Sequence, residues 1–567
     1  MGRESTSSRN REKFALGIDY GTESGRAAVV RVSNGELVSS VIVPYPDGVI
    51  DSRLPTGPKL EHDWALQNPR DYLRVVEKGV PKALKAAGVK PEHVIGLGTD
   101  FTASSPLPVK GDGTPLCFLP KFRKHPHAWV KLWKHHAAQP EADHINEVGR
   151  ERNEEFIRIY GGKYSSEWFF SKLLQVVNEA PGIYRAMDSF VEAADWIVWQ
   201  LTGEEKRSTC TAGYKAMWVK GKGFPSADFF RALHPSLENV IGTKVPESYF
   251  PLGARAGGLT EEWARKTGLK EGTPVSIGNV DAHVAVPACA VTEPGSLVMI
   301  MGTSTCHILL GAERQMVEGM CGVVEDGVVP GLWGYEAGQS AVGDIFAWFF
   351  ENGVHESVHR EARRSKLPFT SVLETQAAAL RPGESGLLAL DWWNGNRSVL
   401  VDAGLTGVLV GLRLATKPHE IYRALIESTA FGTRQIIEAF ESRGVEVRNL
   451  VACGGLPEKN HLLMQIYADV TGREITIAQQ PLICPALGSA MHGAVAAGTA
   501  AGGYDTIFEA TRKMAHLQMT TYRPRKREHE VYDRIFEEYQ VLHDYFGRGT
   551  NDVMKRLKAL QAEQASH

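Results

Sequence analysis

An aspartate set among small and apolar residues is the strongest candidate for chemistry in this sequence. Asp281 stands in the segment 278–283, GNVDAH, where a buried charge would be costly without a task. A carboxylate at such a place can accept the proton of an attacking hydroxyl group as a general base. It can equally cap the helix that we expect to begin near Ala282, and the two roles are compatible.

Two turns rich in glycine and hydroxyl residues could hold phosphate groups. The first follows Asp19 and contains Thr22, and the second, GTST at 302–305, comes about 280 residues later. Backbone N–H groups can cradle a phosphate only where the chain turns tightly without bulky side chains. Either turn alone would be an ordinary hairpin. Because an apolar run precedes both, we interpret them as two copies of one phosphate cradle.

Three charged residues stand out against their surroundings. Asp19 ends an apolar run, where it could reach Mg²⁺ directly or through water or stabilise the hairpin as an Asx-turn residue. Lys215 and Glu336 are the only charges in the segments 209–218 and 327–342. Isolated charges that line a cleft mark binding sites, whereas a buried pair of them can be a structural salt bridge between lobes.

Two further residues could contact a bound molecule. Ala103, in the turn FTAS at 101–104, would offer backbone groups, and Trp133 could cover an apolar face. Core packing is the alternative for Trp133, because Trp129, Leu132 and Trp133 share helical spacing. The adjacent pair His135 and His136 is no metal site, since neighbouring helix residues point apart.

The familiar phosphate-binding motifs are absent. No G-x-x-x-x-G-K-[ST] occurs, and no G-x-G-x-x-G opens a helix after a strand. The segment GGK at 161–163 fails the test because Tyr164 follows it. An ATP-dependent enzyme with this sequence is therefore neither a P-loop NTPase nor a protein-kinase fold, and the repeated turns favour a duplicated fold in which two hairpins grip the phosphates.

Alternating strands and helices must position these residues. Apolar runs predict strands and longer periodic segments predict helices: strands at 14–19, 94–99, 296–301 and 450–453, helices at 72–87, 191–201, 419–442 and 525–560. This alternation indicates α/β domains. The repeat indicates two related domains that meet near 287–295, with a cleft between them as a favoured ligand site.

Composition narrows the class of protein. The 567 residues are 43% hydrophobic with a net charge of −3, which is globular composition at a length that needs at least two domains and offers no basic field for nucleic acid. Seven scattered cysteines without a C-x-x-C pair indicate reduced thiols, neither disulfides nor zinc ligands. The first 13 residues carry no apolar leader and no run of 18 apolar residues follows. We expect a cytoplasmic protein without a membrane partner.

Six motifs, in order along the chain, resemble those of the FGGY carbohydrate kinases. They are DYGTESGR at 19–26, SEW at 166–168 with KLL at 172–174, ADW at 194–196, NVDAH at 279–283, GQS at 338–340 and GG at 454–455. The resemblance runs from about residue 14 to residue 500. Within the family, GTDFTASS at 98–105, TAGYKAMW at 211–218 and YEAGQS at 335–340 are most similar to the ribulokinase branch.

The resemblance implies an α/β fold of two ribonuclease-H-like domains with an interdomain cleft. Residues 14–287 would form the N-terminal, sugar-binding domain, and residues 295–567 the C-terminal, nucleotide-binding domain with its C-terminal helix. It also implies a role for each candidate residue: Asp281 as general base, Asp19 and Asp281 as Mg²⁺ ligands, Ala103, Trp133, Lys215, Asp281 and Glu336 as sugar contacts, and Thr22, Gly302, Thr303, Ser304, Gly343, Gly454, Gly455 and Asn460 as contacts of ATP.

The expected activity is ATP-dependent phosphorylation of L-ribulose to L-ribulose 5-phosphate in L-arabinose catabolism. One alternative is another FGGY kinase, acting on D-ribulose, D-xylulose, a pentitol or glycerol. A second is an actin- or Hsp70-like ATPase, which would leave Asp281, Lys215 and Glu336 without a shared purpose. The expected partners are a small sugar and ATP, with no nucleic acid, and the sequence leaves a homo-oligomer open.

Overall fold

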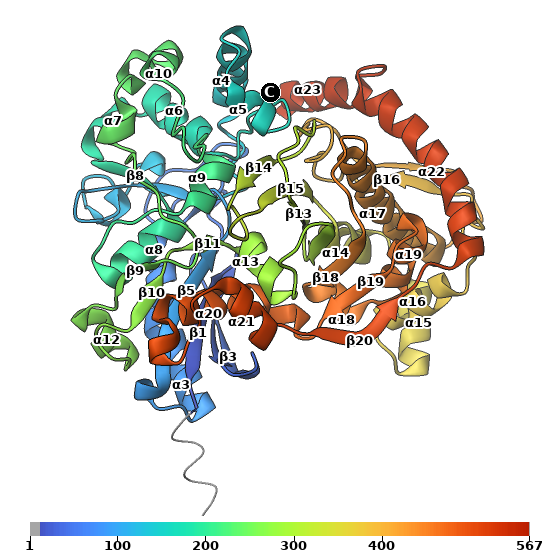
Figure 1. The fold of residues 1–567 in the computed structure, drawn as a ribbon. Helices are drawn as coiled ribbons and strands as arrows, with labels where there is room; N and C mark the ends of the chain where they lie inside the picture. The colour runs from blue at the N-terminus through green and yellow to red at the C-terminus, as the bar shows by residue number, and fades with distance from the viewer. Residues whose placement is uncertain (1–11, 566–567) are drawn as a thin grey trace, which may run out of the picture.

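Two seven-stranded sheets organise the molecule, which we describe from a computed structural model of residues 12–565 (Figure 1). The polar start of the chain, 1–11, lies outside the described residues. The first sheet has the strand order β3-β2-β1-β5-β10-β9, with β11 paired to β5. Its strands are β1 (Phe14–Tyr20), β2 (Ser24–Arg31), β3 (Leu37–Pro44), β5 (Val94–Phe101), β9 (Arg255–Gly258), β10 (Pro274–Ser276) and β11 (Asn279–Val280).

The second sheet repeats this plan. Its order is β14-β15-β13-β12-β18-β19-β20. Its strands are β12 (Ser296–Met301), β13 (Thr305–Gly311), β14 (Gly322–Glu325), β15 (Trp333–Gln339), β18 (Asn449–Cys453), β19 (Ile475–Ala478) and β20 (Leu517–Tyr522). In both sheets an antiparallel hairpin, β1-β2 or β12-β13, is followed by a parallel neighbour, β5 or β18. The predicted internal repeat is therefore a repeat of topology. We call the parts built on the two sheets the N-terminal and C-terminal lobes.

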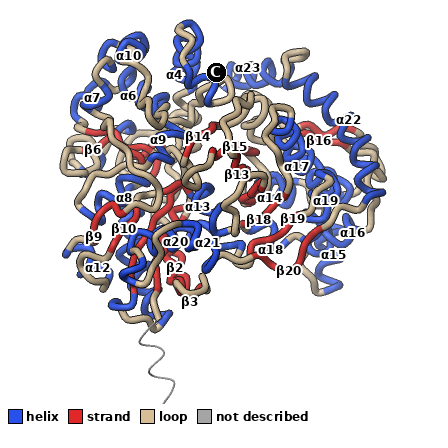
Figure 2. Tube along the Cα trace, viewed as in Figure 1, coloured by secondary structure: helices blue, strands red, loops and turns tan. Residues whose placement is uncertain are grey.

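Helices surround both sheets (Figure 2). In the N-terminal lobe they are α2 (Pro69–Arg74), which continues through a π-helical turn into α3 (Val80–Ala87), α4 (Gln139–Glu151), α5 (Glu155–Ile159), α6 (Phe169–Glu179), α7 (Pro181–Ala186), α8 (Ala193–Thr202), α9 (Thr209–Lys215), α10 (Ala227–Leu233), α11 (Val240–Thr243) and α12 (Glu261–Thr267). In the C-terminal lobe they are α14 (Gly343–Asn352), α15 (Glu356–Ser365), α16 (Phe369–Ala378), α17 (Pro418–Glu441), α18 (Gly455–Lys459), α19 (His461–Thr471), α21 (Ile507–Met514), α22 (Lys526–Gly547) and α23 (Val553–Ala565).

Two helices join the lobes. Helix α13 (Asp281–Ala288) leads out of the first sheet, and α20 (Cys484–Ala497), late in the chain, returns to pack on β1 and β5; Figure 1 shows the orange α20 against the blue strands. Glycines make this approach possible. A Cβ atom on Gly17 or Gly98 would lie 1.8 or 1.9 Å from a carbonyl oxygen of α20, so no side chain fits there.

Two local expectations were wrong. The segment around Trp133 is the short strand β7 (Val130–Lys131) followed by turns, because β7 pairs with β4 (Leu66–Gln67) and the strand pairing overrides the helical spacing. The segment 525–560 forms two helices, α22 and α23, which Gly549 at φ +83° separates. Between residues 12 and 565, no helix is both long and apolar enough to cross a membrane.

Candidate active site

A cavity of about 840 Å³ lies between the two lobes. Eight of the residues singled out in the sequence line it: Thr22, Ala103, Trp133, Lys215, Asp281, Thr303, Ser304 and Glu336. The remaining ones, Asp19, Gly302, Gly343, Gly454, Gly455 and Asn460, do not form its wall. The structure thus brings both turns, the isolated charges and the aspartate to one place.

Three aspartates meet at the carboxyl ends of neighbouring strands in the first sheet. Asp19 on β1 stands opposite Asp100 on the parallel strand β5, and Asn279 of β11 pairs with Asp100 from the other side. Asp281 follows β11 directly and begins α13, where its Oδ1 accepts a hydrogen bond of 2.7 Å from the backbone N–H of Ala282. Val280 is the N-cap residue of α13 and no side chain caps this helix, so Asp281 does not take the capping role that its sequence position allowed. It lines the cavity instead.

Burial makes these carboxyl groups weak acids. Desolvation, followed by the charge of Asp19, raises the pKa of Asp281 to about 7. Desolvation also raises the pKa of Asp19, which the nearby Arg26 counteracts. The pKa of Asp100 is raised most strongly, by burial and by Asp19, although Ser489 Oγ donates a 2.6 Å hydrogen bond to its Oδ2. Arg26 acts against the shift at Asp19 and Lys215 against that at Asp281, but burial outweighs both cations.

The two isolated charges form an ion pair between the lobes. Lys215 ends α9, Glu336 lies within β15, and Lys215 Nζ is 2.7 and 2.9 Å from the two carboxylate oxygens. Both residues are buried, yet both line the cavity. Burial opposes the charge on Glu336, but Lys215 and, after it, His283 at 3.3 Å outweigh burial and lower the pKa of Glu336 to about 2. The pair therefore stays ionised at the cavity wall.

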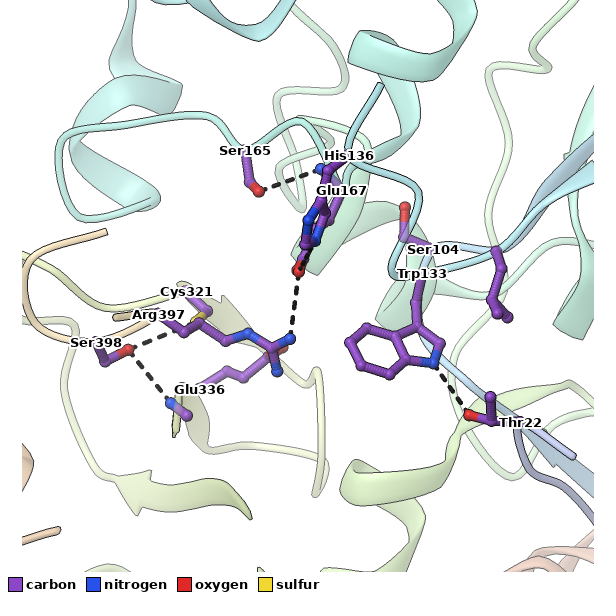
Figure 3. A network of polar contacts seen from close by, with 12 residues as sticks. Thr22, Ser104, Trp133, His136, Ser165, Glu167, Cys321, Glu336, Arg397 and Ser398 are labelled. Atoms are coloured by element: carbon purple, nitrogen blue, oxygen red, sulfur yellow. Dashed lines mark hydrogen bonds and ion pairs between the residues drawn. The ribbon is translucent and has the colours of Figure 1, made fainter. Parts of the chain in front are cut away.

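A second ionic contact between the lobes lies in the wall of the cavity, and Figure 3 shows the side chains that make it. Arg397, from the C-terminal lobe, donates to Glu167 Oε1 at 3.3 Å, and His136 Nε2 lies 3.0 Å from the same oxygen. The Arg397 guanidinium is also 5.4 Å from the ring centroid of Trp133, whose indole N–H donates to Thr22 Oγ1 at 3.1 Å. These contacts fix the Trp133 ring as one wall of the cavity.

The two glycine turns occupy equivalent places in the two hairpins but differ in length, with four residues between Tyr20 and Gly25 and three between Met301 and Thr305. The N–H of Gly21 donates to Ser24 O at 3.0 Å, and that of Gly302 donates to Ser304 O at 2.9 Å. Gly343, the first residue of α14, packs on the second turn so closely that a Cβ atom there would lie 2.5 Å from Gly302 O. Both turns open at the same end of their sheets, as the repeat of topology requires.

Strand β18 ends at a conformation that only glycine adopts easily. Gly454 has φ +102°, and a Cβ atom on it would lie 2.3 Å from Met301 O. Gly455 then begins α18. Asn460 caps the next helix, α19, by accepting from the N–H of Leu463, and its amide donates to Tyr422 OH at 2.9 Å. Its side-chain groups are therefore already engaged within the C-terminal lobe.

Comparison with known proteins decides the family. Residues 14–287 match the N-terminal domain of the FGGY family of carbohydrate kinases, and residues 297–497 match the C-terminal domain. The chain belongs to this family. Because FGGY kinases are ATP-dependent sugar phosphotransferases, ATP is one substrate of the chain.

Relatives with high sequence identity span nearly the whole chain. The ribulokinase of Halalkalibacterium halodurans is 57% identical over 553 residues, which cover 97% of this chain and 98% of that protein. The ribulokinase of Mycolicibacterium smegmatis is 48% identical over 552 residues, 97% of each chain. The match therefore includes both lobes of the FGGY fold and the cavity between them.

Solved sugar kinases share the fold at lower identity. The xylulose kinases of Rhodospirillum rubrum and Lactobacillus acidophilus have TM-scores of 0.73 and 0.76 at 22% and 16% identity. Each comparison covers 94% of this chain and 98% of the solved chain. They confirm the predicted two-lobed FGGY architecture, related to that of actin and Hsp70.

Sequence reasoning missed several residues at this FGGY site. Asp100 lies in the quoted motif GTDFTASS, and its charge within a buried strand was the available signal. Glu167 lies in the quoted motif SEW, but Arg397, in a loop 230 residues away, carried no local signal. Lys172 was quoted without a role: it is buried and donates to Ser104 O at 2.6 Å and Leu132 O at 2.8 Å, which positions the turns that carry Ala103 and Trp133.

Proposed function

We propose that this chain transfers the γ-phosphate of ATP to L-ribulose and forms L-ribulose 5-phosphate, as a ribulokinase of L-arabinose catabolism in the cytoplasm. Relatives described as ribulokinases support the substrate, since they are up to 57% identical over nearly the full length. The observation that carries the chemistry is the position of Asp281, a cavity-lining carboxylate beside two other acids and within one cavity with Thr303 of the second turn.

Asp281 is the proposed general base. Phosphoryl transfer requires an acceptor hydroxyl aligned with the γ-phosphorus and a carboxylate near the hydroxyl proton. A base works best when its pKa lies near the working pH, and burial raises the pKa of Asp281 to about 7. The hydrogen bond from the N–H of Ala282 occupies Oδ1, which leaves Oδ2 for the hydroxyl group.

Mg²⁺ fits the aspartate cluster. Asp100 Oδ1 is buried without a hydrogen-bond partner, and Asp19, Asp100 and Asp281 together lack sufficient counter-charge. Carboxylate oxygens suit this ion, which usually keeps several waters. We assign Asp19 and Asp281 as its protein ligands. When bound, Mg²⁺ supplies positive charge for the phosphate oxygens, while the side chain of Asp100 supports Asp19 from the neighbouring strand.

The proposed sugar contacts all line the cavity. The Lys215–Glu336 pair offers a donor and an acceptor for hydroxyl groups, the Ala103 turn offers backbone groups, and the Trp133 ring offers an apolar face. Because Lys215 and Glu336 come from different lobes, a sugar bound there contacts both. We infer that residues 14–287 supply most of the sugar site.

The proposed nucleotide contacts lie on the C-terminal lobe, except for Thr22 of the first turn. Gly302, Thr303 and Ser304, with Thr22 from the first turn, are the proposed phosphate contacts. Gly343, Gly454, Gly455 and Asn460 are the proposed nucleoside contacts; for Asn460 this means its backbone, because its side chain is engaged. We infer that residues 295–567 form this nucleotide-binding part.

Replacement of Asp281 by Asn tests the mechanism, since it keeps the size and removes the base. We expect turnover to fall at least about a hundredfold, with sugar binding by calorimetry much less affected. Near-normal turnover would refute the role of Asp281.

The identity of the substrate is tested by measuring ADP production with a panel of ketopentoses and pentitols. Preference for D-xylulose would overturn the L-ribulose assignment. ADP release without any sugar would favour an ATPase.

A further inference from the structure

Three cysteines from distant parts of the chain meet between the lobes. Cys289 follows the end of α13, Cys453 is the last residue of β18, and Cys484 is the first residue of α20. Their sulfur atoms all lie within 4.8 Å of one another, and all three residues are fully buried. The sequence predicted scattered thiols with no ligand role. The fold instead gathers three of the seven into one cluster, which we call the thiol cluster.

The geometry of the cluster matches metal–thiolate coordination. A zinc ion with Zn–S bonds of about 2.3 Å in tetrahedral geometry holds its sulfur atoms about 3.8 Å apart. The sulfur atoms of Cys289 and Cys484 are 3.8 Å apart. Across residues 12–565, no other group of three cysteine, histidine or carboxylate side chains is gathered this closely. The aspartates near Asp281 are therefore more widely spread than these thiols.

The surroundings favour a soft cation over a hard one. The cluster lies in an apolar core with neighbours such as Val286, Val451 and Leu487, so no oxygen ligand for Mg²⁺ or Ca²⁺ is supplied by these side chains. Soft thiolate ligands select Zn²⁺, Cu⁺ and similar ions. Binding of a divalent ion releases three protons and leaves one net negative charge, which the N-terminus of the fourteen-residue helix α20 stabilises at Cys484.

We propose that Cys289, Cys453 and Cys484 form a binding site for one thiophilic metal cation such as Zn²⁺, Cd²⁺ or Cu⁺. The site joins three elements that must move relative to one another if the lobes open and close. Helix α13 begins at Asp281, and Gly454 directly follows Cys453. A bound ion fixes α13, β18 and α20 relative to one another. It therefore stabilises the folded protein and slows the opening and closing of the lobes, and with it turnover. The effect on turnover rests on the proposed kinase function; metal binding does not.

Cadmium titration of the full-length protein tests the site. The protein is kept reduced with a phosphine, and the thiolate-to-cadmium charge-transfer absorption is followed, with bound metal counted after gel filtration. We expect one Cd²⁺ per chain and no binding by the triple variant C289A/C453A/C484A. The matched control is C117A/C210A, which removes two other buried thiols and should bind like the unaltered protein.

Single variants keep the test decisive if the triple variant does not fold. Each of C289A, C453A and C484A should weaken Cd²⁺ affinity at least tenfold, and Cd²⁺ should raise the melting temperature of the unaltered protein and the control alone. Absence of the charge-transfer band in the unaltered protein, or equal binding by the single variants, would overturn the site. These readouts involve no sugar or ATP, so they are independent of whether the chain is a ribulokinase.

Discussion

Lys215→Met separates the structural and binding roles of the ion pair between the lobes. The substitution keeps the length of the side chain and removes the ammonium group that faces Glu336. With Lys215 present, the pKa of Glu336 is about 2 against an ordinary value of 4.5. A carboxyl group whose pKa is lower in the folded state stabilises the fold above its unfolded pKa, and the lowered pKa of Glu336 corresponds to about 3 kcal/mol at neutral pH, of which Lys215 supplies the largest part and His283 the next. Removal of one partner of a buried pair has a similar cost, about 3–5 kcal/mol.

The expected result at pH 7 is a fall in melting temperature of about 5 °C, measured by differential scanning calorimetry. Below pH 4.5 the difference between the two proteins should shrink, because Glu336 in the variant takes up a proton that the native pair resists until about pH 2. The double variant K215M/E336Q leaves no buried charge and should recover most of the loss. It should still fail to gain stability from L-ribulose.

Two outcomes would refute this reasoning. An unchanged melting temperature in the single variant would mean that the pair contributes nothing to the fold. Normal stabilisation of the double variant by L-ribulose would mean that neither residue contacts the sugar.

Three further perturbations test other parts of the structure. Asp281 must be deprotonated to act as a base, and burial raises its pKa to about 7. We therefore expect kcat/KM to fall about tenfold per pH unit below that value, and the midpoint of this fall to move to lower pH at saturating Mg²⁺. A flat profile from pH 5.5 to 8 would contradict the role. Arg397→Gln breaks the contact with Glu167, and the side chains of Arg397 and Glu167 are only 16% and 19% exposed. We expect a loss of about 2 kcal/mol in sugar-binding free energy, which is a roughly thirtyfold rise in KM for the sugar. R381Q, which breaks an exposed pair, should leave KM unchanged. Gly98→Ala places a Cβ atom 1.9 Å from Ser489 O. The free energy of unfolding, measured in urea, should fall by at least about 3 kcal/mol. A Cβ atom on Gly182 meets nothing within 4 Å, so the control G182A should leave this free energy unchanged.

Local sequence patterns predicted most of the fold and the central part of the site. The strands at 14–20 and 296–301 and their turns were visible because apolar runs end at glycine and hydroxyl residues. Asp281, Lys215 and Glu336 were visible because a lone charge in an uncharged segment is conspicuous.

What the sequence did not reveal depends on long-range contacts. Arg397 has no distinctive neighbours in the chain and acquires its role from Glu167, which lies on the opposite lobe. The three cysteines of the thiol cluster are separated by 164 and 31 residues, and no spacing rule connects them. The spacing of Trp129, Leu132 and Trp133 fits a helix and suggested core packing as the alternative for Trp133, whereas pairing of β7 with β4 decided its surroundings.

The return of α20 to the first sheet also affects how the protein is made. Strand β5 ends at Phe101 and α20 begins at Cys484, so a ribosome that adds about 5–20 residues per second needs roughly 20–80 s between them. During that interval the glycine-rich face of β1 and β5 has no helix to cover it. The N-terminal lobe therefore leaves the ribosome with one face of its sheet uncovered. Packing of this sheet is completed only after α20 (Cys484–Ala497), near the end of the polypeptide, has been synthesised.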